Sequence, residues 1–380
     1  MKVLNYLEFR DGFNYIKDTQ IIFRPLSEYF VLHNYIVKKY SKDRIKEIFR
    51  EAAIEDGYIC YERIKKSLKL KNKESENNNL EFIKIFLEHI SLLGFGEVSL
   101  KYLIKDKIEF SHKKYFASKS YEYNYGETPE VLVEEILGAY IENFLSFHFG
   151  KKVKVLTIKK GNNISYNAKI TDEKFTFKPK YSYPKKEKSK IISTTLKTII
   201  YKNQIKKEDG VITMTGIEVH ITPYLYLIKL IELIYDKELV EFFKLYGVAI
   251  GRAEYSWIKP VVKNDPIKHI DKICETFLVN GLGNAYFCQK NNEFIYNNNF
   301  GWYIKYFDEK ILNLIKIRRS LWFKTVHDFV YNNESEILIN KNIIKFKFKN
   351  KKPKLTVKEN EIYSKINNGI KVDRKYKKKY

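Results

Sequence analysis

The sequence is poor in the residues that build disulfide frameworks and metal sites. Its 380 residues contain three cysteines, Cys60, Cys274 and Cys288, and seven histidines. The cysteines are odd in number and far apart, which argues against a disulfide framework or a zinc-finger spacing and favours a reducing, cytoplasmic location. The histidines show no ligand spacing such as His-x-Glu-x-x-His. We therefore expect neither a metal centre nor another bound cofactor.

Long apolar stretches are also missing. No run approaches the roughly 18 apolar residues of a transmembrane helix. The first residues mix polar and apolar side chains and lack the apolar centre of a secretory signal. We therefore expect no membrane span. Hydrophobic residues still make up 44% of the chain and aromatic residues 16%, which is enough for packed cores, and the length fits two or three domains.

The sequence contains no recognisable catalytic set. The residues of the pair Glu134-Glu135 are adjacent, so on a helix their side chains point about 100° apart and do not form an acid–base pair. The pairs Glu55-Asp56 and Asp308-Glu309 are interpreted in the same way, as solvated faces and helix starts. Because no nucleophile, base and orienting group can be assembled, we expect a protein that is not an enzyme.

The paired glycines, Cys60 and His148 are better explained by packing roles than by catalytic or ligand-binding roles. Gly247-x-x-x-Gly251 lacks the lysine and the third glycine of a phosphate-binding loop, so we expect helix packing there. Cys60 lies on a predicted helix near small residues and is expected to be buried. His148, near the end of a predicted helix, is expected to be structural.

One pattern occurs twice along the chain. Phe-x7-Gly-x3-Tyr begins at Phe49 and again at Phe243. An apolar helical stretch precedes each copy, and an amphipathic helix follows it and ends on Gly-x-Gly, at Gly94 and at Gly281. Alternating strands come next in both copies. The matched order predicts a tandem duplication.

The expected elements are the same in each copy. The first copy has predicted helices over 26–40, 80–93 and 130–149 and hairpins over 97–111 and 151–170. The second has helices over 224–235, 267–279 and 309–331 and hairpins over 284–296 and 336–349. This pattern predicts an α+β fold of two similar units, each an antiparallel sheet with packed helices. The expected organisation is a first domain over 1–175, a basic linker over 176–207, a second domain over 208–350 and a basic tail over 351–380.

The residues from Phe82 to Ile170 resemble the 4-vinyl reductase domain family, which is related to the small subunits of transport protein particles. A shorter pattern from Phe242 to Phe348 resembles it as well. The stretches that carry the resemblance are Leu92-Leu93-Gly94-Phe95-Gly96, Gly138-Ala139-Tyr140-Ile141-Glu142, and Gly150-Lys151-Lys152-Val153-Lys154-Val155 with Gly161.

The resemblance implies that family's fold, frequent homodimers and, in some members, a pocket for a small apolar ligand. Many members place cysteines in the final hairpin and near the long helix, whereas these stretches contain no cysteine here. A thiolate site is therefore not carried over. The second copy also departs from the small residues of the long helix, with Ser320-Leu321-Trp322 in place of Gly138-Ala139-Tyr140.

Positive charge is concentrated in two segments. Residues 151–207 contain 17 lysines and 3 acidic residues, and residues 341–380 contain 15 lysines or arginines and 3 acidic residues. They contribute +14 and +12 to the net charge of +24, so the other 283 residues sum to −2. Localised charge of this size indicates a polyanionic partner. Lysine greatly exceeds arginine in both segments, which favours phosphate contacts over reading of base sequence.

The linker also interleaves aromatic residues with lysines, a composition that suits stacking on unpaired bases. Phe175 and Phe177 lie in this stretch. The residues that we expect to contact nucleic acid are Lys151, Lys152, Lys154, Lys159, Lys160, Lys178, Lys180, Tyr181, Tyr183, Lys185, Lys186, Lys188, Lys190, Lys351, Lys352, Lys354, Arg374, Lys375, Lys377, Lys378 and Lys379.

Three functions fit these observations. The first is binding to RNA or to a ribonucleoprotein, such as the ribosome, through the linker and the tail. The second is a sensor whose two domains bind a small apolar ligand, as the family resemblance implies. The third is binding to anionic lipid, because lysine-rich tails do this too. A basic tail is also typical of a disordered, solubilising chain end.

Overall fold

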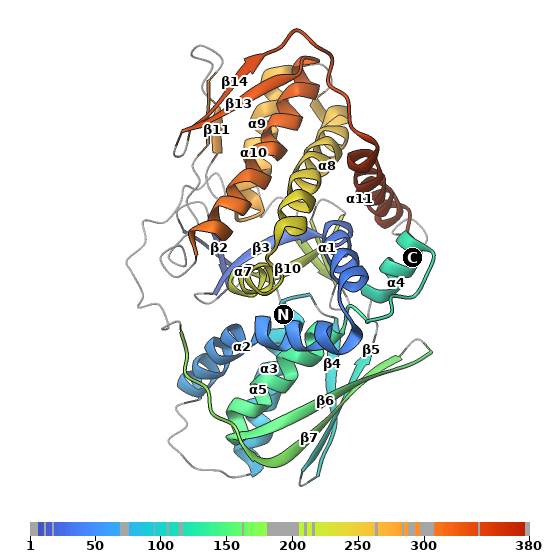
Figure 1. Cartoon of the computed structure of the whole chain (residues 1–380). Helices are drawn as coiled ribbons and strands as arrows, with labels where there is room; N and C mark the ends of the chain where they lie inside the picture. Colours follow the sequence, from blue (N-terminus) through green and yellow to red (C-terminus); the bar gives the residue numbers. More distant parts are fainter. Residues whose placement is uncertain are drawn as a thin grey trace. The chain divides into compact units, whose positions relative to one another are not determined.

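The structure, a computed structural model, describes residues 7–10, 13–16, 19–68, 76–94, 96–104, 106–113, 117–161, 163–180, 205–208, 211–214, 217–262, 265–282, 285–287, 293–296, 308–340 and 343–376. They form two compact units (Figure 1). Unit one consists of the described residues within 32–187 and 204–233, and unit two of those within 6–31 and 234–380. Each unit thus combines segments from both halves of the sequence.

Unit one packs helices against a four-stranded antiparallel sheet of order β4-β5-β7-β6 (Figure 1). Its elements are the end of α1 (Leu26–Lys39), α2 (Lys42–Ser67), α3 (Glu76–Leu92), β4 (Glu97–Ile104), β5 (Lys107–Lys113), α4 (Ala117–Tyr125), α5 (Glu135–Phe149), β6 (Lys151–Lys160), β7 (Asn163–Lys174), β8 (Ile205–Glu208), β9 (Val211–Met214), β10 (Ile217–Pro223) and α7 (Tyr224–Leu233). Strands β8, β9 and β10 pair in that order.

The core of unit one lies between this sheet and helices α2, α3 and α5. Phe86 and Phe144 stack there with ring centroids 3.6 Å apart. In β6, Val153 points into the core while Lys152 and Lys154 are exposed. The period-two pattern of this strand therefore assigns its faces correctly.

Unit two has a four-stranded sheet of the same topology, β11-β12-β14-β13. Its elements are β1 (Leu7–Arg10), β2 (Phe13–Ile16), β3 (Thr19–Pro25), the start of α1, α8 (Lys237–Val262), α9 (Pro266–Val279), β11 (Ala285–Phe287), β12 (Glu293–Tyr296), α10 (Glu309–Tyr331), β13 (Ser335–Asn340), β14 (Ile343–Phe348) and α11 (Val357–Tyr376). Strands β1, β2 and β3 pair in that order. The described part of the chain is thus α+β with antiparallel sheets.

The two halves of the sequence exchange their first elements. Strands β1–β3 and the start of α1 come from the first half and belong to unit two, whereas β8–β10 and α7 come from the second half and belong to unit one. In unit one, the backbone N–H of Ile221 in β10 donates to the carbonyl of Leu93, which follows α3, at 3.3 Å. In unit two, the N–H of Phe23 in β3 donates to the carbonyl of Asn280, which follows α9, at 3.1 Å. The two bonds occupy corresponding places, so the exchange of segments is reciprocal.

The glycines behave as the sequence predicts. Gly94, Gly150 and Gly281 lie just past helix ends with φ of +82°, +63° and +73°, values that favour glycine. In unit two, Gly247 and Gly251 bring α8 against α10. A Cβ on either residue would lie 2.5 Å from a carbonyl oxygen of α10. These are packing glycines.

Other segments differ from the sequence expectations. The strands β1–β3 and β8–β10 and the short helix α4 were not predicted. Helix α5 begins at Glu135, because residues 130–134 form bends and turns. The expected basic tail contains helix α11. Of the expected linker, residues 181–204 lie outside the described residues. The domain boundaries assigned from the sequence stay predictions.

Candidate nucleic-acid interface

The four-stranded sheet of unit one carries basic side chains on the face away from α3 and α5, which we call the outer face. Three lysines lie directly opposite one another across three neighbouring strands. Lys107 in β5 pairs with Lys169 in β7, and Lys169 pairs with Lys154 in β6. We call these residues the lysine row. Neighbouring strands are about 4.8 Å apart, so the row extends over about 10 Å.

The side chains of the lysine row are exposed, and none of them forms an ion pair with another described residue. Like charges directly opposite in a sheet are unfavourable. Glu173, an acidic residue whose charge interacts with Lys154, pairs with Lys152 at 2.5 Å. The hydrogen bond from Lys152, and secondarily the charge of Lys154, lower the pKa of Glu173. The row therefore remains a cluster of largely uncompensated positive charge.

A second row lies beside the first, two residues further along each strand. It contains Tyr102, Glu109, Asn167 and Leu156, and we call it the tyrosine row. The carboxylate of Glu109, opposite Tyr102 in the strand register, raises the pKa of the Tyr102 phenol. The hydrogen bond from Lys101, at 2.6 Å, is the main reason that the pKa of Glu109 is lowered. The only acidic group of this row is thus neutralised locally.

The outer face also exposes apolar surface. Tyr102 is 40% exposed, Leu156 is 54% exposed, and Ile104, which lies opposite Lys107, is 60% exposed. Asn167 lies between Glu109 and Leu156, and its amide oxygen is buried without a hydrogen-bond partner among the described residues. The groups that the face exposes are therefore cationic and aromatic, which suits a ligand with phosphates and bases.

The sheet of unit two pairs lysines with acidic residues. In the strand register, Lys345 of β14 lies between Glu293 and Leu338. In the next position of β14, Lys347 lies opposite Glu336. Each lysine of β14 thus has an acidic residue opposite it in one register, whereas the lysine row of unit one has lysine opposite lysine.

Several lysines predicted from the sequence are already engaged. Lys151 pairs with Asp172 at 3.6 Å, Lys152 with Glu173, and Lys159 with Glu122 at 2.5 Å. Exposed pairs of this kind are weak and remain available to a stronger anion. Lys154 and Lys160 lie on the outer face of the sheet. Sequence reasoning missed Lys107 and Lys169, because only strand register places them beside Lys154.

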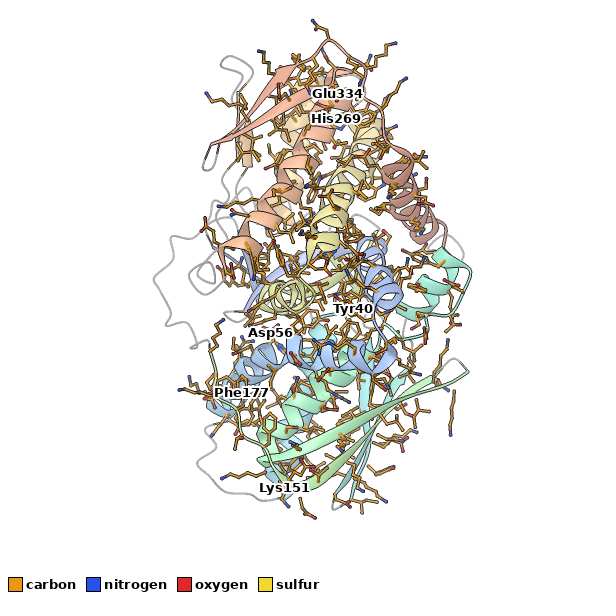
Figure 2. All side chains as sticks on the ribbon, viewed as in Figure 1. Tyr40, Asp56, Lys151, Phe177, His269 and Glu334 are labelled. Atoms are coloured by element: carbon orange, nitrogen blue, oxygen red, sulfur yellow. The ribbon has the colours of Figure 1, made fainter. Side chains whose placement is uncertain are left out.

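The start of the linker folds back on unit one. Phe175 and Phe177 pack on Phe147 of α5, with ring centroids 5.1 and 5.3 Å away, and Phe177 also contacts Tyr58 of α2 (Figure 2). These two aromatic residues are therefore engaged within the protein, contrary to the expectation that they would stack on bases. Lys178 and Lys180 are exposed. The remaining linker candidates, Tyr181, Tyr183, Lys185, Lys186, Lys188 and Lys190, lie outside the described residues.

The C-terminal basic segment is partly structured. Lys351, Lys352 and Lys354 precede α11, and Lys351 pairs with Glu334 at 3.5 Å. Arg374 and Lys375 lie in the last turn of α11, whereas Lys377, Lys378 and Lys379 lie beyond the described residues. Ile366 of α11 is buried, and Tyr363 lies 3.3 Å from the hydroxyl of Ser256 in α8. This helix is therefore docked on unit two.

Two buried acids correct another sequence expectation. Glu55 and Asp56 lie in the middle of α2 and are both buried, not on a solvated face (Figure 2). Burial raises the pKa of Asp56 to about 7, although hydrogen bonds from Tyr140 and from the N–H of Tyr226 oppose the shift. In unit two, burial raises the pKa of Glu254 to about 8. Asp308, by contrast, caps the start of α10 as expected.

The other candidates are structural. His148 stacks on Phe82 with ring centroids 4.2 Å apart, and burial lowers its pKa to about 4. Cys60 is buried. Within the described ranges, no group of three or more His, Cys, Asp or Glu side chains is placed to hold a metal ion. None of the helices described has the length and apolar character needed to cross a bilayer.

Comparisons with known proteins add little to this geometry. No family model matches the sequence, and no curated protein matches it. Among solved structures, the chain is similar to the crystal structure of the phenol-responsive sensory domain of the transcription activator PoxR with phenol. The match has 13% sequence identity and a TM-score of 0.38, and it covers 44% of this chain and 86% of that one. This is a partial and distant likeness of structure.

Proposed function

We propose that this protein is not an enzyme and binds RNA, free or within a ribonucleoprotein such as the ribosome. The outer face of unit one is the main contact, and the basic linker and tail contribute further charge. The observation that carries this proposal is the row formed by Lys107, Lys169 and Lys154. Three adjacent lysines without anionic partners are electrostatically unfavourable alone and favourable against phosphates.

Two features support RNA over other anionic partners. Lysine presents a point charge to a phosphate and does not form the planar, two-point contact of arginine with a base edge. The lysine row also lies beside an exposed tyrosine, Tyr102, whose ring offers a stacking surface for an unpaired base. The linker and tail have the same lysine-rich composition.

The proposal is tested by removing the row. In the variant Lys107→Gln/Lys154→Gln/Lys169→Gln, we expect RNA affinity to fall at least tenfold at moderate salt, because three phosphate contacts are lost. The control is Lys347→Gln with Lys345→Gln on the equivalent sheet of unit two. Co-sedimentation with ribosomes should weaken in parallel and disappear at high salt. Equal RNA affinity of the triple lysine variant and of the control would contradict the proposal.

We also propose that the two halves are a tandem duplication of a 4-vinyl-reductase-like unit. Element order and sheet order recur. Gly57 faces Asn143 of α5, and Gly251 faces Thr325 of α10, at corresponding points of the two helix pairs. Side-chain chemistry then diverged, since the residues opposite the lysines differ between the two sheets.

A small-ligand sensor is the second candidate function. It is favoured by Glu254, which is buried beside Trp322 and accepts a hydrogen bond from the indole N–H. Its other oxygen has no partner among the described residues. With a pKa of about 8, this acid is largely protonated near neutral pH and offers a hydrogen-bond donor in an aromatic interior. Native mass spectrometry of the purified protein, with Glu254→Gln for comparison, would detect a bound small molecule.

A further inference from the structure

We infer that the outer face of unit one binds unpaired nucleotides, with the lysine row on the phosphates and Tyr102 stacked on a base. This inference rests on the proposed RNA-binding function and specifies the form of RNA that the face accepts. A single strand is the occupant to which it commits, because base contacts require bases that are splayed out of a helix.

The spacing of the two rows fits a nucleotide strand. Outward positions in a strand are two residues, or about 6.7 Å, apart. The lysine row and the tyrosine row therefore run parallel across the same strands, about 6.7 Å from each other. Lysine stems are long and flexible, so their ammonium groups reach phosphates that lie above or beside the row. A single RNA strand that crosses the sheet then places its phosphates at the lysine row and its bases at the tyrosine row.

Tyr102 lies in a position suited to stacking. It is on β4, the edge strand, opposite Glu109 of the neighbouring strand. The residue is 40% exposed on the outer face, so a base can reach its ring. Stacking on an aromatic ring tolerates any base, so this contact gives affinity without strict sequence preference.

The remaining groups of the face are consistent with this ligand. Leu156 and Ile104 supply exposed apolar surface against which sugars and bases lose water. Glu109 is the one acid of the tyrosine row, and the hydrogen bond from Lys101 compensates its charge. A duplex, whose bases are stacked inside, would leave Tyr102 without a role.

The experiment compares single-stranded with double-stranded RNA on the full-length protein. Labelled oligonucleotides of about 12 nucleotides, and the duplex of the same sequence, are titrated by fluorescence anisotropy. Tyr102→Leu removes the ring and keeps an apolar side chain, whereas Tyr102→Phe keeps the ring. We expect Tyr102→Leu to weaken single-strand binding about tenfold, Tyr102→Phe to change it less than about twofold, and neither to change duplex binding.

The outcomes separate this inference from the proposed function. If the triple lysine variant loses affinity and Tyr102→Leu does not, RNA binding stands and the stacking platform is wrong. A preference of the wild type for the duplex overturns the platform in the same way. If neither variant changes affinity, both the function and the platform fail. Binding to phosphatidylserine vesicles that excess single-stranded RNA does not displace would assign the face to a membrane and overturn the inference. Circular dichroism of each variant confirms that it is folded.

Discussion

The hydroxyl of Tyr140 donates a 3.0 Å hydrogen bond to Oδ2 of Asp56 in the interior of unit one. Trp322, at the corresponding position of the long helix of unit two, donates its indole N–H to Glu254. Both units thus place an aromatic donor on the long helix against a buried acid on the facing helix. When the two copies are aligned, the two acids lie one helical turn apart. The units therefore share the type of contact but not the position of the acid.

Asp56 should make the stability of the protein depend on pH. Its folded pKa is about 7 and its unfolded pKa about 3.9. Between these values the folded state binds more protons than the unfolded state, so the free energy of unfolding falls as pH rises and becomes level above about pH 7. Asp56→Asn, which mimics the protonated acid, should lose this dependence and be more stable than the wild type above about pH 7. Urea denaturation between about pH 4 and pH 8 measures it.

Glu254 serves as the internal reference for that experiment. Its pKa of about 8 adds a further fall of stability toward about pH 8, which Asp56→Asn retains and Glu254→Gln removes. Parallel pH profiles of Asp56→Asn and the wild type would show that Asp56 is ionised in the folded protein, against our assignment.

The reciprocal exchange of segments predicts that the two halves depend on each other. Residues 1–203 expressed alone lack β10 and α7, which complete unit one, and residues 204–380 lack β3, which contributes to unit two. We expect each fragment alone to unfold without cooperativity and to expose apolar surface. An equimolar mixture should recover a cooperative transition by circular dichroism. Two fragments that each melt cooperatively when separate would contradict the exchange.

We predict that Lys169 lowers the stability of the fold and contributes to RNA affinity. It lies between Lys107 and Lys154, so Lys169→Gln removes two cross-strand repulsions. We expect Tm to rise by roughly 1–3 °C at low salt, with a smaller rise at high salt, while RNA affinity falls. Lys347→Gln, opposite Glu336 in unit two, is the matched control and should lower Tm slightly. An unchanged or lower Tm for Lys169→Gln would mean that the row is compensated.

Helix α11 should contribute to the stability of unit two. Arg252 of α8 lies 5.5 Å from the ring of Tyr363 and 4.3 Å from that of Phe329. Ile366 of α11 is buried. Truncation before Val357 should therefore lower Tm by several degrees, and Ile366→Ala should cost about 2–4 kcal/mol. Removal of residues 377–380 alone should leave Tm unchanged. If the longer truncation melts like the full chain, α11 is only a basic tail.

Local features were predictable from the sequence. The alternation in residues 151–158 assigned the faces of β6, and the glycines at 94, 150 and 281 marked helix ends because only glycine readily takes positive φ there. Helix α10, 309–331, was bounded correctly by Asp308 and Asn332. These signals are contained within short windows of chain, which is why sequence reasoning finds them.

Long-range features were not predictable. Lys107 and Lys169 are 62 positions apart and meet only through strand register, which a single sequence does not reveal. Asp56 was assigned to a solvated face because its partners, Tyr140 and Tyr226, come from distant segments. The four-residue strands β1, β2, β8 and β9 are too short to show a period. Tertiary pairing, not local propensity, decides all of these positions.

The most direct test of RNA binding through the outer face is the salt dependence of affinity for single-stranded RNA. Each phosphate contact to a single strand contributes about −0.7 to the slope of log affinity against log salt. Replacing Lys107, Lys154 and Lys169 by Gln should make this slope shallower by about 2, whereas the control at Lys345 and Lys347 should leave it unchanged. Identical slopes for the wild type and the row variant would contradict the account.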